Sequence, residues 1–106
     1  EMERLLQLEN RPDAVYVASD YAALGALQIL NENEINVPET IRLIGFGNEL
    51  FTSLVTPSIS SIEQHSKDIG RLAAETFLKR VNEPELKQSL NKIILKAELI
   101  VRDSSK

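Results

Sequence analysis

The 106-residue sequence has no cysteine, no tryptophan and a single histidine, His65. Without cysteine there is no disulfide framework, no thiolate zinc site and no cysteine nucleophile, and one imidazole is too few for the histidine clusters of most catalytic metal sites. No stretch approaches the roughly 18 apolar residues that a membrane-spanning helix needs. With four glycines and four prolines, the composition is neither fibrous nor disordered. We therefore expect a globular domain, or part of one, with no metal centre and no membrane partner.

Positive charge is scarce in the first half of the chain. Residues 1–53 carry nine acidic and three basic side chains, whereas residues 54–106 carry seven acidic and nine basic ones. The basic residues of the second half are dispersed among acidic ones, and only Lys79 and Arg80 are adjacent. A surface that follows a phosphate backbone needs a continuous basic stripe. The sequence therefore predicts that this segment does not itself contact DNA.

The apolar pattern predicts alternating strands and helices, which is typical of a parallel sheet flanked by helices. Strands are expected at 14–18, apolar throughout and so buried on both faces, and at 41–46. Helices are expected at 21–33 and 66–81, a short helix at 48–57, an extended run at 58–64, and one or two strands within 90–101. The fold class is therefore α/β.

Three local signals refine this prediction. Ser19 and Asp20 are good helix caps before the first long helix, and Ser66 is a plausible cap for the second. Gly25, inside the first long helix, predicts close packing against a neighbouring element. The opening residues 1–8 are typical of a helix without a preceding cap, so we expect a chain cut from a longer one.

Polar residues follow the first two predicted strands, at the end of an open α/β sheet where ligands bind. Ser19 and Asp20 follow the first strand and either cap the helix or point into a cleft. After the second strand, Gly47 allows close backbone approach, and Asn48 with Glu49 offers polar groups to a small ligand; the alternative is a plain turn. A binding site at this edge is the functional hypothesis.

The chemistry of an enzyme is not assembled in the sequence. His65 and Ser66 are adjacent in the chain, and neighbouring residues rarely meet as a nucleophile and its base. Asp20 at a strand end resembles the phosphoacceptor of a receiver domain, but the earlier acidic pair and the later strand-end lysine are missing. We therefore expect no catalytic residue and no cofactor.

Five ordered blocks resemble the effector-binding domain of LacI/GalR-type transcriptional regulators, which is similar to periplasmic sugar-binding proteins. The blocks are 12–27, 37–46, 57–64, 69–74 and 99–105. The resemblance implies that residues 1–106 are the carboxyl-terminal part of this two-lobed domain, mostly its second lobe. About 65–97 would belong to the first lobe, and the amino-terminal helix-turn-helix domain is absent from these residues.

The same resemblance implies a cytoplasmic, homodimeric regulator with no enzymatic activity. Its operator affinity would respond to a small-molecule effector, a sugar or a related metabolite, and it would reach DNA only through the missing amino-terminal domain. The alternative is a periplasmic-type solute-binding protein, which has the same lobes and captures nutrients.

Two sets of residues are carried over from the family. The expected effector-site residues are Ser19, Asp20, Phe46, Gly47, Asn48, Glu49 and Gln64. Gly47 stands where many members have an aspartate, so either Asn48 or Glu49 substitutes for it or the effector is not a typical sugar. The expected dimer-interface residues are Leu24, Leu27, Leu54 and Val55, for which ordinary core packing is the alternative.

Overall fold

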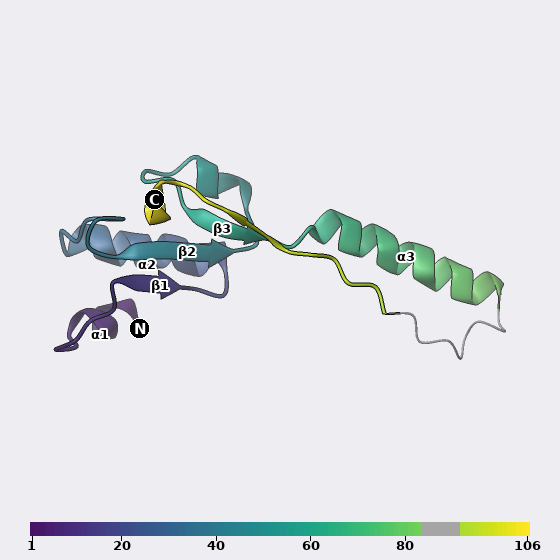
Figure 1. Ribbon diagram of the computed structural model, residues 1–106, viewed down its shortest axis with the longest axis horizontal. Helices are drawn as coiled ribbons and strands as arrows, with labels where there is room; N and C mark the ends of the chain where they lie inside the picture. The colour runs from purple at the N-terminus through teal and green to yellow at the C-terminus, as the bar shows by residue number, and fades with distance from the viewer. Residues whose placement is uncertain (84–91) are drawn as a thin grey trace. The chain divides into compact units, whose positions relative to one another are not determined.

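The computed structural model describes residues 1–83 and 92–106, and these fall into two compact units (Figure 1). One unit comprises residues 1–63 and 98–106, and the other comprises residues 64–97. The predicted strand region 90–101 begins within residues 84–91, so its start lies outside the described residues.

A four-stranded sheet in the order β1-β2-β3-β4 organises the first unit. The strands β1 (Ala14–Tyr16), β2 (Arg42–Phe46) and β3 (Ser60–Glu63) are parallel, which confirms the α/β class. The last strand, β4 (Glu98–Ile100), pairs antiparallel with β3, with Glu63 opposite Glu98. The chain leaves the sheet at the end of β3 and re-enters it at the same end, so the returning strand must run in the opposite direction.

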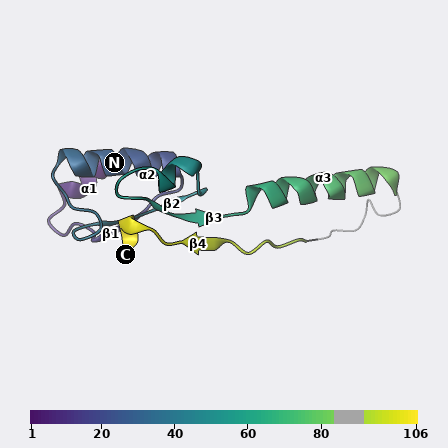
Figure 2. The same cartoon turned by 90° about the horizontal axis from the view of Figure 1, so that it is seen from above.

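Helix α2 (Asp20–Glu32) lies along one face of the sheet, as Figure 2 shows. Its amino terminus is capped as predicted, because Ser19 Oγ accepts a hydrogen bond from the Ala22 amide at 3.2 Å. The apolar face of α2 packs on the sheet and forms the core together with Met2 of the short helix α1 (Met2–Leu6). The buried apolar residues are Met2, Ala23, Ala26, Leu27, Leu30, Ile41, Leu43 and Ile59.

Two predictions about packing in this unit are wrong. Strand β1 is not buried on both faces: Ala14 and Tyr16 are exposed and only Val15 packs against the core. The reason is that β1 is the edge strand of the described sheet and has α2 on one face only. Gly25 has no atom within 4 Å of the position that a Cβ would occupy, so within the described residues it packs closely against nothing.

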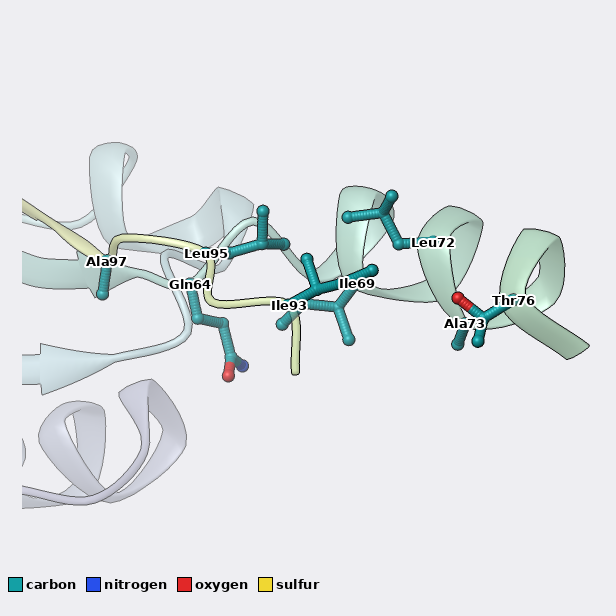
Figure 3. A pocket seen from close by; sticks show the side chains of 8 residues that line it. All are labelled: Gln64, Ile69, Leu72, Ala73, Thr76, Ile93, Leu95 and Ala97. Carbon is teal, nitrogen blue, oxygen red and sulfur yellow. The ribbon is translucent and has the colours of Figure 1, made fainter. Parts of the chain in front are cut away.

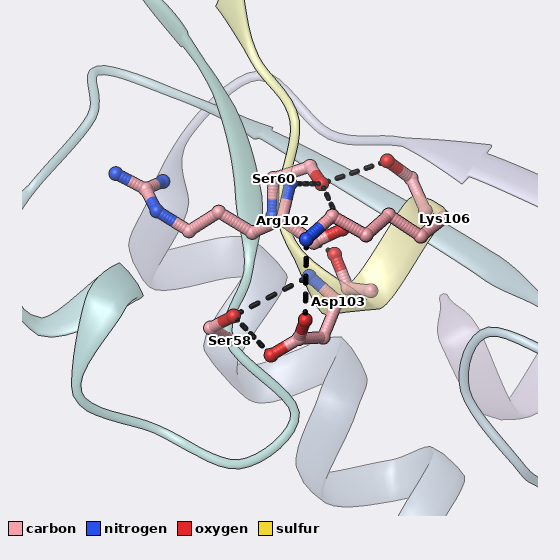
Figure 4. Close-up of polar contacts among 7 residues, drawn as sticks. Ser58, Ser60, Arg102, Asp103 and Lys106 are labelled. Atoms are coloured by element: carbon pink, nitrogen blue, oxygen red, sulfur yellow. Dashed lines mark hydrogen bonds and ion pairs between the residues drawn. The ribbon is translucent and has the colours of Figure 1, made fainter.

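Serine side chains hold the end of the chain beside β3 through hydrogen bonds (Figure 4). The Ser60 amide donates to Ser104 Oγ at 2.9 Å, and Ser104 Oγ donates to the Leu43 carbonyl at 2.6 Å. Ser58 Oγ donates to Asp103 Oδ2 at 2.6 Å, and this bond lowers the pKa of Asp103. These contacts anchor the 3-10 turn Asp103–Ser105 and thereby place Arg102 beside the sheet.

In its described part, the second unit contains one long helix, α3 (Ser66–Asn82), and no residue of this helix is buried. The prediction that Ser66 caps this helix is wrong: Ser66 is already helical, and His65, with a left-handed backbone (φ 57°), takes the cap position without a side-chain cap bond. The apolar side of α3 and residues 93–97 line a pocket of about 520 Å³ (Figure 3). Its lining residues are Gln64, Ile69, Leu72, Ala73, Thr76, Ile93, Leu95 and Ala97.

No helix among residues 1–83 and 92–106 is long and apolar enough to cross a membrane. The short helix predicted within 48–57 is the 3-10 turn Leu50–Ser53.

Candidate binding site

Asp20 connects three elements at the carboxyl ends of the strands. It is the first residue of α2, directly after β1, and its side chain is only 1% exposed. Its Oδ1 accepts a hydrogen bond from Ser61 Oγ at 2.6 Å, and its Oδ2 accepts one from the Glu49 amide at 2.7 Å. A buried carboxylate is tolerated only when such donors replace its water. The carboxylate therefore holds the loop after β2 against β3.

Gly45 makes room for this carboxylate. A Cβ at position 45 would overlap Asp20 Oδ1 and would lie 3.3 Å from the Ala23 Cβ. Gly47 has a positive φ of 123°, which side chains rarely tolerate, and its Cβ position is 3.5 Å from Asp20 Oδ2. Gly45 in β2 thus allows Asp20 to approach the backbone, and Gly47 after β2 allows the chain to turn.

Asn48 is the centre of a second group of hydrogen bonds. Its backbone is left-handed (φ 52°), and its amide donates to Ser61 Oγ at 2.9 Å. Its side-chain Nδ2 donates to Glu63 Oε2 at 2.9 Å, and its Oδ1 accepts from Arg102 Nη2 at 2.6 Å. Arg102 Nη1 also donates to the Ile59 carbonyl at 2.8 Å. These bonds fix the loop conformation and the orientation of the Asn48 amide.

The other predicted site residues have different surroundings. Ser19 caps α2, Phe46 is half-buried at the end of β2, and Glu49 is exposed. The structure brings Asp20, Gly47, Asn48 and Glu49 together. Gln64 belongs to the second compact unit, where it lines the pocket beside α3.

Sequence reasoning missed Ser61, Glu63 and Arg102 as members of this group. Ser60 and Ser61 are completely buried although both are polar, and two successive serines inside a strand were the available signal. Arg102 gave no local signal, since it is 54 residues away from Asn48 in the chain.

The predicted dimer-interface residues divide into buried and exposed ones. The assignment of Leu27 is wrong, because its side chain is 3% exposed and belongs to the core. Val55 is partly buried against the same core, whereas Leu24 and Leu54 are 36% and 73% exposed. The rings of Tyr21 and Phe51 lie 4.9 Å apart and join α2 to the Leu50–Ser53 turn near Leu54.

Among the described residues, no group of three or more histidine or acidic side chains is arranged to hold a metal ion. The site offers carboxylate, amide and guanidinium groups on a fixed backbone. Such groups suit the recognition of a small polar molecule by hydrogen bonds.

The family description "periplasmic binding protein-like domain" matches residues 1–105, and the chain belongs to this family. Within it, the resemblance to LacI/GalR-type regulators is confirmed by relatives and solved structures. A probable HTH-type transcriptional repressor, ExuR, from Bacillus subtilis is 38% identical over 103 residues, which is 97% of this chain and 30% of that protein.

Two solved structures show the same likeness. A putative LacI-family regulator from Sanguibacter keddieii is 31% identical, with a TM-score of 0.88 over 97% of this chain and 39% of that one. The regulator CelR, solved as a cellobiose complex, is 28% identical, with a TM-score of 0.80 over 88% of this chain and 28% of that one. The chain thus spans about a third or less of the length of ExuR and CelR.

Proposed function

We propose that this chain is the effector-sensing part of a DNA-binding transcriptional regulator whose operator affinity changes when a sugar or a related metabolite binds. The observation that carries the proposal is the set of polar groups around Asn48 at the carboxyl ends of β2 and β3, in a periplasmic-binding-protein-like domain. The names of ExuR and CelR, which describe regulators, favour this function over nutrient capture.

The longer protein is proposed to have two lobes, with the unit 1–63 and 98–106 in the second lobe and about 65–97 in the first. The division into compact units at 63/64 and 97/98 supports this boundary. The second unit also exposes apolar side chains that a small unit cannot bury by itself, such as Phe77 at 66% and Ile94 at 74% exposure. The remainder of the first lobe would cover them.

The proposed mechanism is a shift between two arrangements of the lobes. An effector that contacts the loop after β2 and the first lobe together favours the arrangement in which both contacts are made. Because regulation of this kind is a coupling free energy between two sites, the effector and the operator must change each other's affinity by the same factor. The protein would act as a homodimer in the cytoplasm, bind DNA through an amino-terminal helix-turn-helix domain and catalyse no reaction.

The test uses the full-length protein that contains this chain and a fluorescent duplex from the region upstream of its own gene. Binding is measured by anisotropy with and without ribose, cellobiose, galactose or galacturonate. We expect specific binding to the duplex that at least one of these compounds changes. Sugar binding without any binding to DNA would contradict the regulator and favour solute capture.

The Asn48→Ala variant should bind the effector about tenfold more weakly, because the loop loses its bonds to Glu63 and Arg102. Titration calorimetry with the sugar that binds the unmodified protein most tightly measures this effect. Asn31→Ala, a change at an exposed position on α2, is the matched control and should leave the affinity unchanged. An unchanged affinity for Asn48→Ala would mean that the loop is only a turn.

The Leu54→Glu variant should weaken the proposed homodimer at least tenfold while the effector affinity stays the same. Leu54 is 73% exposed beside the Tyr21–Phe51 pair, so a carboxylate there would be desolvated at an interface. Sedimentation equilibrium measures the dimer constant. Leu8→Glu, which changes another exposed leucine (46%), is the control, and equal constants for the two variants would remove Leu54 from the interface.

A further inference from the structure

The outer edge of β1, on the side away from β2, has no strand beside it among the described residues, because β1 comes first in the sheet order. The Arg42 amide donates to the Asp13 carbonyl at 2.8 Å. The Val17 amide donates to the Ile44 carbonyl at 2.9 Å. Since backbone groups alternate in direction along a strand, the N–H of Tyr16 points to the outer edge. A further strand could accept a hydrogen bond from it.

Strand β1 lacks the features that protect the edge strands of stable sheets. Such strands carry charged side chains, prolines or bulges, which prevent pairing with other strands. Residues Ala14–Tyr16 include no charged side chain and no proline, and the apolar run continues through Ala18. A continuous apolar run is typical of an interior strand of a parallel sheet. The composition of β1 therefore fits a position between two strands.

A cavity of about 320 Å³ lies beside β1, where α1 and α2 meet. Its walls are mostly apolar and include Leu5 of α1, Ile29 of α2, and Val15 and Val17 at β1. Gly25 of α2 also lines this cavity, and no atom lies within 4 Å of the position that its Cβ would occupy. The glycine thus leaves room for a side chain that comes from outside the described residues.

The position of α1 determines on which side of β1 a preceding strand must lie. Helix α1 is on the same face of the sheet as α2, because Met2 shares a core with Ala26 and Leu27 (Figure 2). Helix α2 connects β1 to β2, and connections between neighbouring parallel strands are right-handed in nearly all proteins. A right-handed connection through α1 on this same face places the strand before α1 on the side of β1 away from β2. That side is the outer edge.

We propose that the outer edge of β1 and the cavity beside Gly25 together form a docking surface for one further strand of the longer protein. This strand precedes α1 in the chain, pairs in parallel with β1 and places an apolar side chain in the cavity. The relative ExuR has ample additional sequence, since the match covers 30% of it. The inference depends neither on the effector nor on DNA binding, so those tests can fail without affecting it.

Amide hydrogen exchange in the full-length protein tests the pairing of Tyr16. Val17 is the internal reference, because its amide bonds to β2 with or without a further strand. We expect the Tyr16 amide to exchange at a rate within about tenfold of that of Val17, at high and at low protein concentration. Faster exchange of Tyr16 than this would overturn the proposal. Protection that is lost on dilution would assign the edge to a second copy of the protein and would also overturn it.

The Gly25→Leu variant of the full-length protein tests whether the cavity is filled. Leucine would stabilise the protein if the cavity were empty, because filling an apolar cavity is favourable. We expect the opposite, a thermal midpoint lowered by about 3 °C or more, since the added side chain overpacks an occupied site. Asn31→Leu, at an exposed position of α2 that does not line the cavity, is the control and should leave the midpoint unchanged.

An unchanged or raised midpoint for Gly25→Leu, or an equal fall for Asn31→Leu, would contradict the docking surface. If Gly25→Leu does not fold, the Gly25→Ala variant decides the question. Alanine is favoured over glycine in an open helix interior, so a raised midpoint for Gly25→Ala would overturn the proposal. We expect a lowered midpoint, because the neighbouring strand leaves no room for the methyl group.

Discussion

Replacing Gly45 by alanine is expected to lower the free energy of unfolding by about 3 kcal/mol, since the added methyl group overpacks a filled site and disturbs a buried hydrogen bond. The new Cβ would overlap Asp20 Oδ1 and press on the Ala23 Cβ at 3.3 Å. Asp20 would have to move away from Ser61, the donor to its Oδ1. Urea unfolding of the full-length protein measures the change.

Gly70→Ala is the matched control for this prediction. Gly70 lies inside α3, and no atom is within 4 Å of the position of its added Cβ. Alanine in an exposed helix interior is favoured over glycine by about 0.5–1 kcal/mol, so this variant should be slightly more stable. Similar unfolding curves for the two variants would show that the close approach of Asp20 does not require glycine at position 45.

Replacing Asp20 by asparagine is expected to cost about 2–3 kcal/mol, the range for leaving buried donors and acceptors mismatched. Both oxygens of Asp20 accept hydrogen bonds, from Ser61 Oγ and from the Glu49 amide. Asparagine has one oxygen and one NH₂ group, so one of the two donors would face another donor. Ser61 Oγ has a second lone pair and can accept from this NH₂ group, but its own hydrogen then loses Asp20 as its acceptor.

A double-mutant cycle with Ser61→Ala checks this explanation by urea unfolding. If the two residues act through their shared hydrogen bond, the combined loss should be smaller than the sum of the single losses. Asp13→Asn, at an exposed position before β1, is the control for the loss of one negative charge and should have little effect. Additive losses would contradict the role of the Asp20–Ser61 bond.

The elements and the fold class could be predicted because their signals are local. The spacing of Ala23, Leu27 and Leu30 predicts the buried face of α2, and Ser19 is a cap recognised by its position alone. The family was also recognisable, since five separate blocks occur in the expected order. The burial of β1 was mispredicted, because an apolar run does not show whether a second layer of this chain covers its other face.

The candidate site was predictable in part. The positions of Asp20 and Asn48 at strand ends followed from the order of strands and helices. Their partners did not, because Ser61 and Arg102 are brought to the site by strand pairing across 41 and 54 residues of sequence. The same limit applies to Leu27, whose place in the core instead of at an interface depends on which face of α2 meets the sheet.

The sequence by itself determined the α/β order of elements, the family and the region of the candidate site, since each depends on short-range patterns of apolar, capping and glycine residues. Only the tertiary structure decided what the polar residues do. It made Asp20 a buried connection between α2, the loop after β2 and β3. It also placed Glu63 and Arg102 on either side of Asn48, because the parallel register of β2 with β3 and the return of β4 bring distant residues within hydrogen-bond distance.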